Sequence, residues 1–294
     1  MNYYLTAAAL KALSSHSLLR KAYRGAGNLK KSHPVWIPKP RWIWEQVVEE
    51  RVNDEGHVLL ELGTGWVHAG SLYSALLIDA SITAFDVWDC RSLYATKNEL
   101  SRIEAAIQTA ENHSPSDKKR AKERAAMALR AQTFDELYKI LNISYIVGEA
   151  GTLNLQDHSV DMIYSQDVLE HVTREVFDAS IQDWRRVLKP QGRFLAWVGL
   201  DDHLAHYDKT KSMKEYLYHS NRLWDHLLSN RLQYINRLTA TEIVRAFQRN
   251  GFEVEKWETE RCSVEVAAVH PHYKWQTQSD LEAICLRLYA RSVS

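Results

Sequence analysis

The apolar residues of the chain fall into short continuous runs that alternate with stretches of helical spacing. Residues 57–62 form an apolar run that stops at Gly63, the stretch that follows to residue 77 has helical spacing, and residues 81–87 form a second run. A strand, a helix and a second strand in this order imply parallel strands joined by a right-handed crossover. The pattern therefore predicts an α/β fold.

The same alternation resumes after residue 144. Further strands are predicted at residues 145–147, 160–165, 193–198, 252–259 and 283–290, with helices at residues 177–188 and 241–250. Between them lie two segments that are much longer than a usual connection. Residues 88–144, which have helical spacing, and residues 201–238 are therefore interpreted as insertions into the α/β domain.

The first part of the chain differs from the rest in charge. Residues 3–23 have the spacing of an amphipathic helix, and residues 1–44 contain eight Lys or Arg but no acidic residue, although the whole chain has no net charge. We interpret residues 1–56 as a basic arm with helices that forms a lid or docks on the acidic body, and residues 57–294 as one catalytic domain. Contact of the arm with an anionic membrane surface is an alternative.

Composition limits the classes of protein to consider. The 294 residues are 45% hydrophobic and 25% charged, which is typical of a globular protein, and the longest apolar runs are too short to span a membrane. The basic residues lie outside any known recognition motif, so nucleic-acid binding is not expected. The three cysteines, Cys90, Cys262 and Cys285, lack the spacing of a disulfide framework or zinc site, so we expect a cytoplasmic protein.

A glycine-rich motif follows the first predicted strand and runs Glu61-Leu62-Gly63-Thr64-Gly65. The two glycines let the backbone turn sharply and approach a ligand closely. Asp86 ends the second predicted strand, 21 residues after Gly65, where a carboxylate can accept hydrogen bonds from both hydroxyls of a ribose. His68 stands where a dinucleotide fingerprint has its third glycine, and Glu61 suits a positively charged amino group better than a pyrophosphate.

These motifs resemble those of the class I S-adenosylmethionine-dependent methyltransferases. Residues 61–65 are similar to the first motif of that family, and Asp86 with the adjacent Val87 to its ribose-binding segment. Residues 148–153 and 157–165 resemble the adenine-binding stretch and the fourth strand. Further along, residues 165–172 and 188–193 resemble the segment after the fourth strand and the turn into the fifth. The cofactor contacts that the resemblance implies are Glu61, Gly63, Thr64, Gly65, Asp86, Val87, Glu149, Ala150 and Gln166.

The resemblance implies a Rossmann-like sheet of seven mostly parallel strands, with helices on both faces and a final antiparallel strand at residues 283–290. It covers residues 57–89 and 145–200 and, more weakly, 239–291. The implied cofactor is S-adenosylmethionine, and the implied reaction is methyl transfer. Residues 206–208 and 236–238 also resemble a bacterial subgroup associated with surface glycans, so we expect a small-molecule or glycan acceptor. The basic arm and both insertions are expected to form its pocket.

Methyl transfer to a hydroxyl oxygen would profit from a base that removes the proton. His171 and His206 both lie on the edge of the sheet where ligands are expected, and these candidate bases are the reason to prefer oxygen as the acceptor atom. We favour His206, because its insertion can adapt to the acceptor and Asp208 can orient the ring or raise its pKa. The spacing of His203, His206 and Asp208 is also compatible with a metal, but a further ligand is lacking and no metal is predicted.

Two other functions are compatible with the same motifs. One is a nicotinamide-dependent oxidoreductase on a similar scaffold, which the missing third glycine disfavours. The other is a catalytically silent partner that binds the cofactor within a complex. The sequence contains no feature that fixes the oligomeric state.

Overall fold

One mixed sheet of seven strands forms the centre of the computed structural model, which describes residues 2–15, 19, 42–50, 56–149 and 151–293. The strand order is β3-β2-β1-β4-β5-β7-β6. Every strand pair is parallel except those of β7, which runs antiparallel to both neighbours, so the predicted fold is confirmed. The strands are β1 (His57–Leu62), β2 (Ala80–Asp86), β3 (Ile143–Val147), β4 (Val160–Gln166), β5 (Leu188–Gly199), β6 (Phe252–Arg261) and β7 (Ala283–Ser292).

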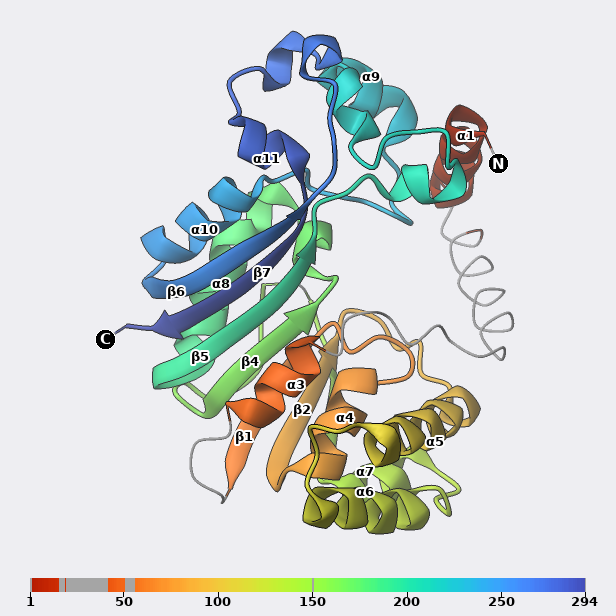
Figure 1. Ribbon diagram of the computed structural model, residues 1–294, viewed down its shortest axis with the longest axis vertical. Helices are drawn as coiled ribbons and strands as arrows, with labels where there is room; N and C mark the ends of the chain where they lie inside the picture. Colours follow the sequence, from red (N-terminus) through yellow and green to blue (C-terminus); the bar gives the residue numbers. More distant parts are fainter. Residues whose placement is uncertain (1, 16–18, 20–41, 51–55, 150, 294) are drawn as a thin grey trace.

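Helices cover both faces of the sheet (Figure 1). Helices α8 (Arg174–Val187) and α10 (Ala240–Arg249) pack on one face, and α3 (Trp42–Glu49) and α4 (Ala69–Leu77) pack on the other. Neighbouring strand residues point to opposite faces, so Leu59 joins the α4 side of the core and Leu60 joins the α8 side. Both faces are buried, which explains why the parallel strands are continuous apolar runs in the sequence.

The first insertion consists of three regular helices, α5 (Leu93–Thr109), α6 (Pro115–Ala128) and α7 (Phe134–Leu141). Each begins at a Ser or Thr whose side chain accepts a hydrogen bond from a backbone N–H of the first turn: Ser92, Ser114 and Thr133. Their apolar faces join the same hydrophobic cluster as α4. The first insertion therefore extends the α4 layer of the domain, as Figure 1 shows at the lower right.

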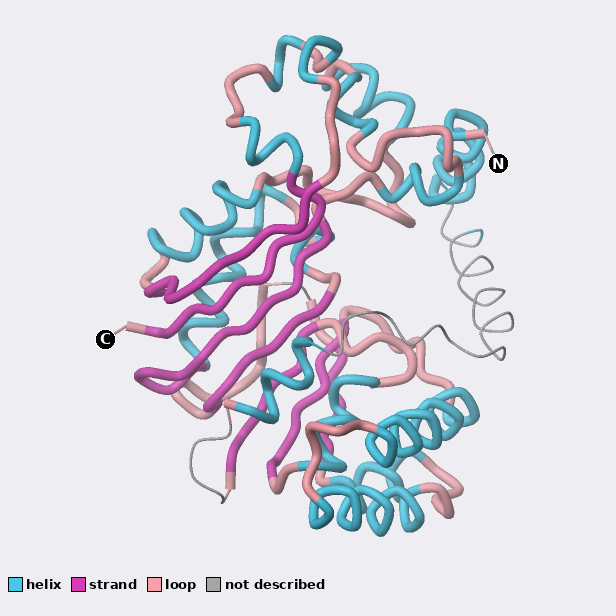
Figure 2. The backbone as a smooth tube through the Cα atoms, viewed as in Figure 1, coloured by secondary structure: helices cyan, strands magenta, loops and turns pink. Residues whose placement is uncertain are grey.

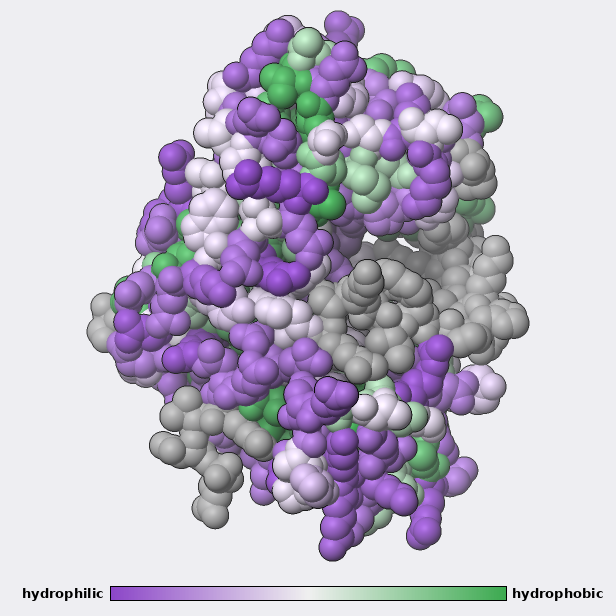
Figure 3. Space-filling view, viewed as in Figure 1, coloured by the Kyte–Doolittle hydropathy of each residue, from purple (hydrophilic) through white to green (hydrophobic). Residues whose placement is uncertain are grey.

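The second insertion, residues 201–238, consists of short turns and the short helix α9 (Asn221–Leu223). It packs against α1 (Tyr3–Ser15) and against the segment before β7, which contains α11 (Gln278–Glu282). We call this assembly the cap: residues 201–238, α1 and residues 262–282. Its apolar side chains form a cluster of their own, separate from the two clusters on the sheet. Figure 2 shows the cap beyond one end of the strands, and Figure 3 shows hydrophobic residues gathered on its surface.

Part of the predicted arm lies outside the described residues. The helix predicted over residues 3–23 is described from Tyr3 to Ser15, and most of the segment up to residue 41 is not described. Lys11 of α1 donates hydrogen bonds to the backbone oxygens of Asp225 and Ser229, so this basic residue contacts the cap. Among the described helices, none has both the length and the apolar character that crossing a membrane requires.

Candidate active site

A pocket of about 380 Å³ lies at the carboxyl ends of β1, β2 and β4. In the sheet β1 lies between β2 and β4, and the strand order reverses at β1. Open α/β sheets bind their ligands at such a point. The lining residues come from the strand ends, from α8 and from the cap: Leu62, Gly63, Phe85, Asp86, Val87, Trp88, Gly151, Leu153, Asp167, Val168, His171, Val172, Trp184, Arg231, Leu232 and Tyr234.

The glycine-rich turn after β1 has two residues with positive φ, Gly63 at 70° and Gly65 at 67°. A Cβ on Gly63 would lie 2.1 Å from Cγ2 of Val168, whereas a Cβ on Gly65 would meet no atom within 4 Å. The sequence predicted that Gly63 keeps space for a ligand. In the fold its missing side chain makes room for Val168, and it is Gly65 that borders open space.

Asp86 connects the turn after β1 to the turn after β2. Its Oδ2 accepts a hydrogen bond from the Gly65 N–H at 2.8 Å, and its Oδ1 accepts one from the Trp88 N–H at 3.2 Å. The side chain is buried, and this desolvation raises the pKa of the Asp86 carboxyl. The pocket is thus bounded by a carboxylate whose position is fixed by two backbone groups.

Glu61, which the sequence predicted as a cofactor contact, instead binds residues of the turn and of α4. Its carboxylate accepts hydrogen bonds from the Thr64 hydroxyl at 2.9 Å, from the Ser71 N–H at 2.9 Å and from the Ser71 hydroxyl. Burial raises the pKa of the Glu61 carboxyl. Neither Glu61 nor Thr64 is among the pocket-lining residues, so both act on the turn and on the start of α4.

A chain of hydrogen bonds runs from the first insertion to this turn. The Tyr138 hydroxyl of α7 lies 3.0 Å from His68 Nε2, and His68 Nδ1 lies 3.0 Å from the Thr64 hydroxyl. The Thr64 proton is donated to Glu61, so His68 Nδ1 carries a hydrogen and Nε2 accepts the one from Tyr138. Burial, together with Arg91, lowers the pKa of His68 to about 3, which keeps the ring neutral.

The remaining predicted cofactor contacts are only partly at the pocket. Val87 lines it, whereas Glu149 is exposed and is not a lining residue. Ala150 lies outside the described residues. Gln166 lies at the end of β4 beside the pocket, and the next two residues, Asp167 and Val168, line it instead.

His171 is the candidate base that lies in the pocket. Its Nδ1 is 2.5 Å from the backbone oxygen of Tyr234, which can only accept a hydrogen bond, so Nδ1 carries a hydrogen. Desolvation by the surrounding protein lowers the pKa of His171, which keeps the ring neutral. A neutral ring with a hydrogen on Nδ1 has a lone pair on Nε2, and the residue that carries this lone pair borders the pocket.

The expectation that Asp208 orients His206 is wrong. Asp208 accepts hydrogen bonds from the Tyr3 N–H at 3.0 Å and from Thr210, because it caps the start of α1. Asp201 is the partner of His206, at 2.5 Å from Nε2, and this contact raises the pKa of His206. His206 does not line the pocket, so the geometry favours His171 over His206.

Sequence reasoning missed Asp167 and Asp201 as site residues. Asp167 lines the pocket with a positive φ of 54°, and desolvation raises its pKa to about 6. Both lie just beyond a strand at the ligand-binding edge of the sheet. Asp167 follows the last residue of β4, and Asp201 is two residues beyond the end of β5. That position was the signal that could have identified them.

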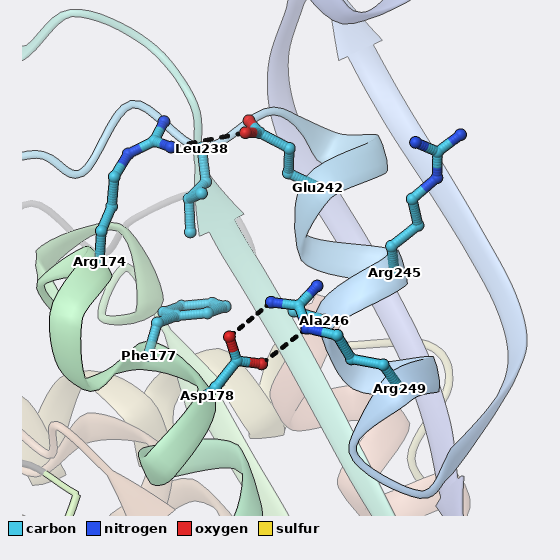
Figure 4. A pocket seen from close by; sticks show the side chains of 8 residues that line it. All are labelled: Arg174, Phe177, Asp178, Leu238, Glu242, Arg245, Ala246 and Arg249. Carbon is cyan, nitrogen blue, oxygen red and sulfur yellow. Dashed lines mark hydrogen bonds and ion pairs between the residues drawn. The ribbon is translucent and has the colours of Figure 1, made fainter.

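A second cavity, of about 260 Å³, lies between α8 and α10 (Figure 4). Four of its five charged side chains pair with each other, Arg174 with Glu242 and Asp178 with Arg249. It lies on the helical face of the domain rather than at the strand ends, so we place the active site in the larger pocket.

Comparisons with known proteins agree with this placement. Residues 60–196, which contain the glycine-rich turn, Asp86 and β4, match the model of a family described as a methyltransferase domain. No curated protein sequence matches the chain.

Two solved structures illustrate the likeness of fold. A Haemonchus contortus phosphoethanolamine N-methyltransferase 2, in complex with phosphomonomethylethanolamine and S-adenosylhomocysteine, is 14% identical with a TM-score of 0.51 over 93% of this chain and 58% of that one. An S-adenosylmethionine-dependent methyltransferase from Methanosarcina mazei is 14% identical with a TM-score of 0.48 over 84% and 97%. The family match identifies residues 60–196 as a methyltransferase domain, and the ordered motifs and the strand order are those of the class I S-adenosylmethionine-dependent methyltransferases.

Proposed function

We propose that the chain transfers the methyl group of S-adenosylmethionine to a hydroxyl oxygen of a small-molecule or glycan acceptor. The observation that carries this proposal is His171, whose Nδ1 hydrogen is held by the Tyr234 backbone oxygen while the residue borders the same pocket as the glycine-rich turn and Asp86. A neutral imidazole nitrogen beside the cofactor pocket serves an acceptor that must lose a proton.

The cofactor end of the pocket is formed by β1 and β2. Asp86 accepts one backbone hydrogen bond on each oxygen, and each oxygen has a second lone pair for a ribose hydroxyl. The apolar side chains of Val87 and Leu153 offer a surface for the adenine ring. Glu61 and Thr64 support the turn indirectly, and Glu149, Ala150 and Gln166 remain predicted contacts.

The reaction needs little covalent help from the protein, because the sulfonium already activates the methyl group. The acceptor oxygen attacks the methyl carbon, the bond between that carbon and sulfur breaks with its electron pair going to sulfur, and the hydroxyl proton leaves. Positioning of the acceptor in line with this bond supplies much of the rate. We assign His171 to the activation of the acceptor hydroxyl.

The acceptor end of the pocket is formed by the cap. Arg231, Leu232 and Tyr234 line the pocket from the second insertion, and they combine a charge, an aliphatic surface and a phenol. This mixture suits a polar molecule of modest size, because the cofactor takes part of the pocket's volume of about 380 Å³. The described part of the arm, α1, contributes no lining residue to the pocket and contacts the second insertion instead.

The direct test is a transfer assay with methyl-labelled S-adenosylmethionine and a panel of hydroxylated acceptors, including sugars and phenols, with amines in parallel. We expect label in at least one hydroxylated acceptor, and the product should show an O-methyl resonance by NMR. Label found only in amines would overturn the oxygen assignment. Absence of S-adenosylhomocysteine binding by calorimetry would overturn the cofactor pocket itself.

A further inference from the structure

Glu170 is a buried carboxylate that the proposed reaction has not used. It lies in the short turn that follows β4, with 2% of its surface exposed. Neither of its oxygens has a hydrogen-bond partner among the described residues. An unpaired buried carboxylate is costly, so it needs a proton or a cation to compensate it.

Two further carboxylates, those of Asp167 and Asp201, lie with Glu170 around Gly199 at the end of β5. A methyl group in place of a Gly199 hydrogen would lie 3.0 Å from Glu170 Oε1, 3.4 Å from Asp201 Oδ1 and 3.7 Å from Asp167 Oδ1. Like charges at this separation repel each other. The cluster therefore creates a local environment that attracts positive charge at the edge of the pocket that Asp167 lines.

Two imidazoles complete the group. One ligand-type atom from each of Glu170, His171 and His203 lies within 4.8 Å of the other two. Two ligand atoms of a tetrahedral zinc ion lie about 3.3 to 3.5 Å apart, so these side chains would move by about 1 Å to share an ion. The ring of His203 lies 5.1 Å from that of His171.

The hydrogen bond that orients the His171 ring fits a role as metal ligand. The Tyr234 backbone oxygen holds the hydrogen on His171 Nδ1, which leaves Nε2 as the free donor atom. A carbonyl that orients a histidine in this way is typical of the outer shell of metal sites.

We propose that Glu170, His171 and His203 bind one divalent transition-metal ion at the acceptor end of the pocket. Two imidazoles with one carboxylate suit Zn²⁺, Mn²⁺ or Fe²⁺ better than Mg²⁺ or Ca²⁺, which prefer oxygen ligands. His171 is one of the pocket's lining residues, so an ion that it held would lie at the edge of the pocket. The spacing in the sequence pointed to His203, His206 and Asp208, whereas the fold brings Glu170 and His171 to His203 and keeps Asp208 at α1.

The inference rests on the proposed function and names the chemistry of its acceptor. A hydroxyl oxygen bound to a divalent ion loses its proton more readily, and the resulting oxyanion attacks the methyl carbon. The proton passes to water, and the electron pair of the broken carbon–sulfur bond remains on sulfur. His171 then acts on the acceptor through the ion that it holds.

The test is a titration of the full-length chain, freed of metal by a chelator and dialysis, with Co²⁺ as a spectroscopic probe and Zn²⁺ as a competitor. We expect one Co²⁺ per chain, with visible absorption bands that Zn²⁺ abolishes. Glu170→Gln and His203→Asn should weaken Co²⁺ binding by more than about 100-fold, beyond what the loss of an outer-shell partner causes. His226→Asn is the matched control, because His226 is an exposed histidine of the same insertion.

Folding and cofactor binding are followed in parallel by thermal unfolding and by calorimetry with S-adenosylhomocysteine. The metal proposal is overturned if the wild-type chain binds no Co²⁺ or Zn²⁺, or if the Glu170 and His203 variants bind like wild type. Methyl transfer that persists in the presence of chelator would overturn the metal alone and leave the proposed function intact. Metal binding without binding of the cofactor would do the reverse.

Discussion

The two insertions occupy similar positions in the topology, because each follows the carboxyl end of a parallel strand. They differ in structure. The first has three regular helices that share the hydrophobic cluster of α4. The cap has short turns around a separate cluster, to which α1 and residues before β7 contribute. The first insertion therefore fixes the turn that the cofactor needs, through Tyr138 and His68, while the cap supplies the acceptor side, through Tyr234 and Arg231.

The largest effect should follow from a change on the acceptor side. His171→Asn should lower the turnover number by roughly 100-fold to 10,000-fold, because the group that activates the acceptor hydroxyl is lost. The affinity for S-adenosylhomocysteine, measured by calorimetry, should stay within a few-fold of wild type. His206→Asn is the control and should cost about tenfold or less. If His206→Asn proves the more harmful variant, the acceptor lies deeper in the cap than we propose.

The next largest effect should follow from Asp86, the last residue of β2. Asp86→Ala removes the acceptor of the Gly65 and Trp88 N–H groups and the bonds proposed for the ribose. Charge-assisted hydrogen bonds contribute about 1.5 to 3 kcal/mol each, so the affinity for the cofactor should fall by more than about 100-fold. Asp89→Ala, an exposed acid nearby, should leave calorimetric affinity near wild type. Unchanged affinity in Asp86→Ala would remove the ribose assignment.

A smaller change tests the attachment of the cap. The Tyr3 hydroxyl donates to Asp202 at 2.6 Å, and both side chains are fully buried. Tyr3→Phe leaves this carboxylate without that donor and should lower the free energy of unfolding by about 1 to 3 kcal/mol, as measured by urea denaturation. The KM for the acceptor should rise while cofactor affinity is kept. Tyr4→Phe, on the exposed side of α1, should change neither quantity. An equal loss of cofactor affinity would show that the cap and the cofactor turn are not separate.

The smallest effect is expected at the other insertion. Tyr138→Phe removes the hydrogen bond to His68 Nε2, which contributes about 0.5 to 1.5 kcal/mol. Cofactor affinity should fall by a few-fold up to about tenfold, with the KM for the acceptor unchanged. Tyr94→Phe, at an exposed position of α5, serves as the control in the same calorimetric titration. A change confined to the acceptor KM would contradict the assignment of this insertion to the cofactor side.

The sheet and the cofactor turn could be predicted because their signals are local. A buried parallel strand is an apolar run, and a tight turn at Gly65 needs a residue that tolerates positive φ. Strand boundaries were less certain, since β5 begins at Leu188 and passes through the Lys189–Gly192 segment that the sequence predicted as a helix stop. A register shift between β4 and β5 accommodates these residues.

The acceptor side could not be predicted in the same way, because its partners are distant in sequence. His171 owes its orientation to a backbone oxygen 63 residues away, and Asp208 is bound to an N–H 205 residues away. Asp208 is two residues from His206 in sequence, so proximity along the chain favoured the wrong pair. The unpaired state of Glu170 is a property of burial and appears only in the folded chain.

The reversed direction of β7 has a consequence for how such an enzyme can change its substrate. Gly199 at the end of β5 pairs with Cys285 near the start of β7, so the segment before β7 arrives at the edge of the sheet where β5 ends. A parallel strand in that position would begin at the opposite edge and deliver its preceding segment away from the pocket. The antiparallel strand thus lets the C-terminal part of the chain join the N-terminal helix and the second insertion in one lobe. Loops in this lobe can gain, lose or exchange residues during evolution while the strands that hold the cofactor keep their sequence.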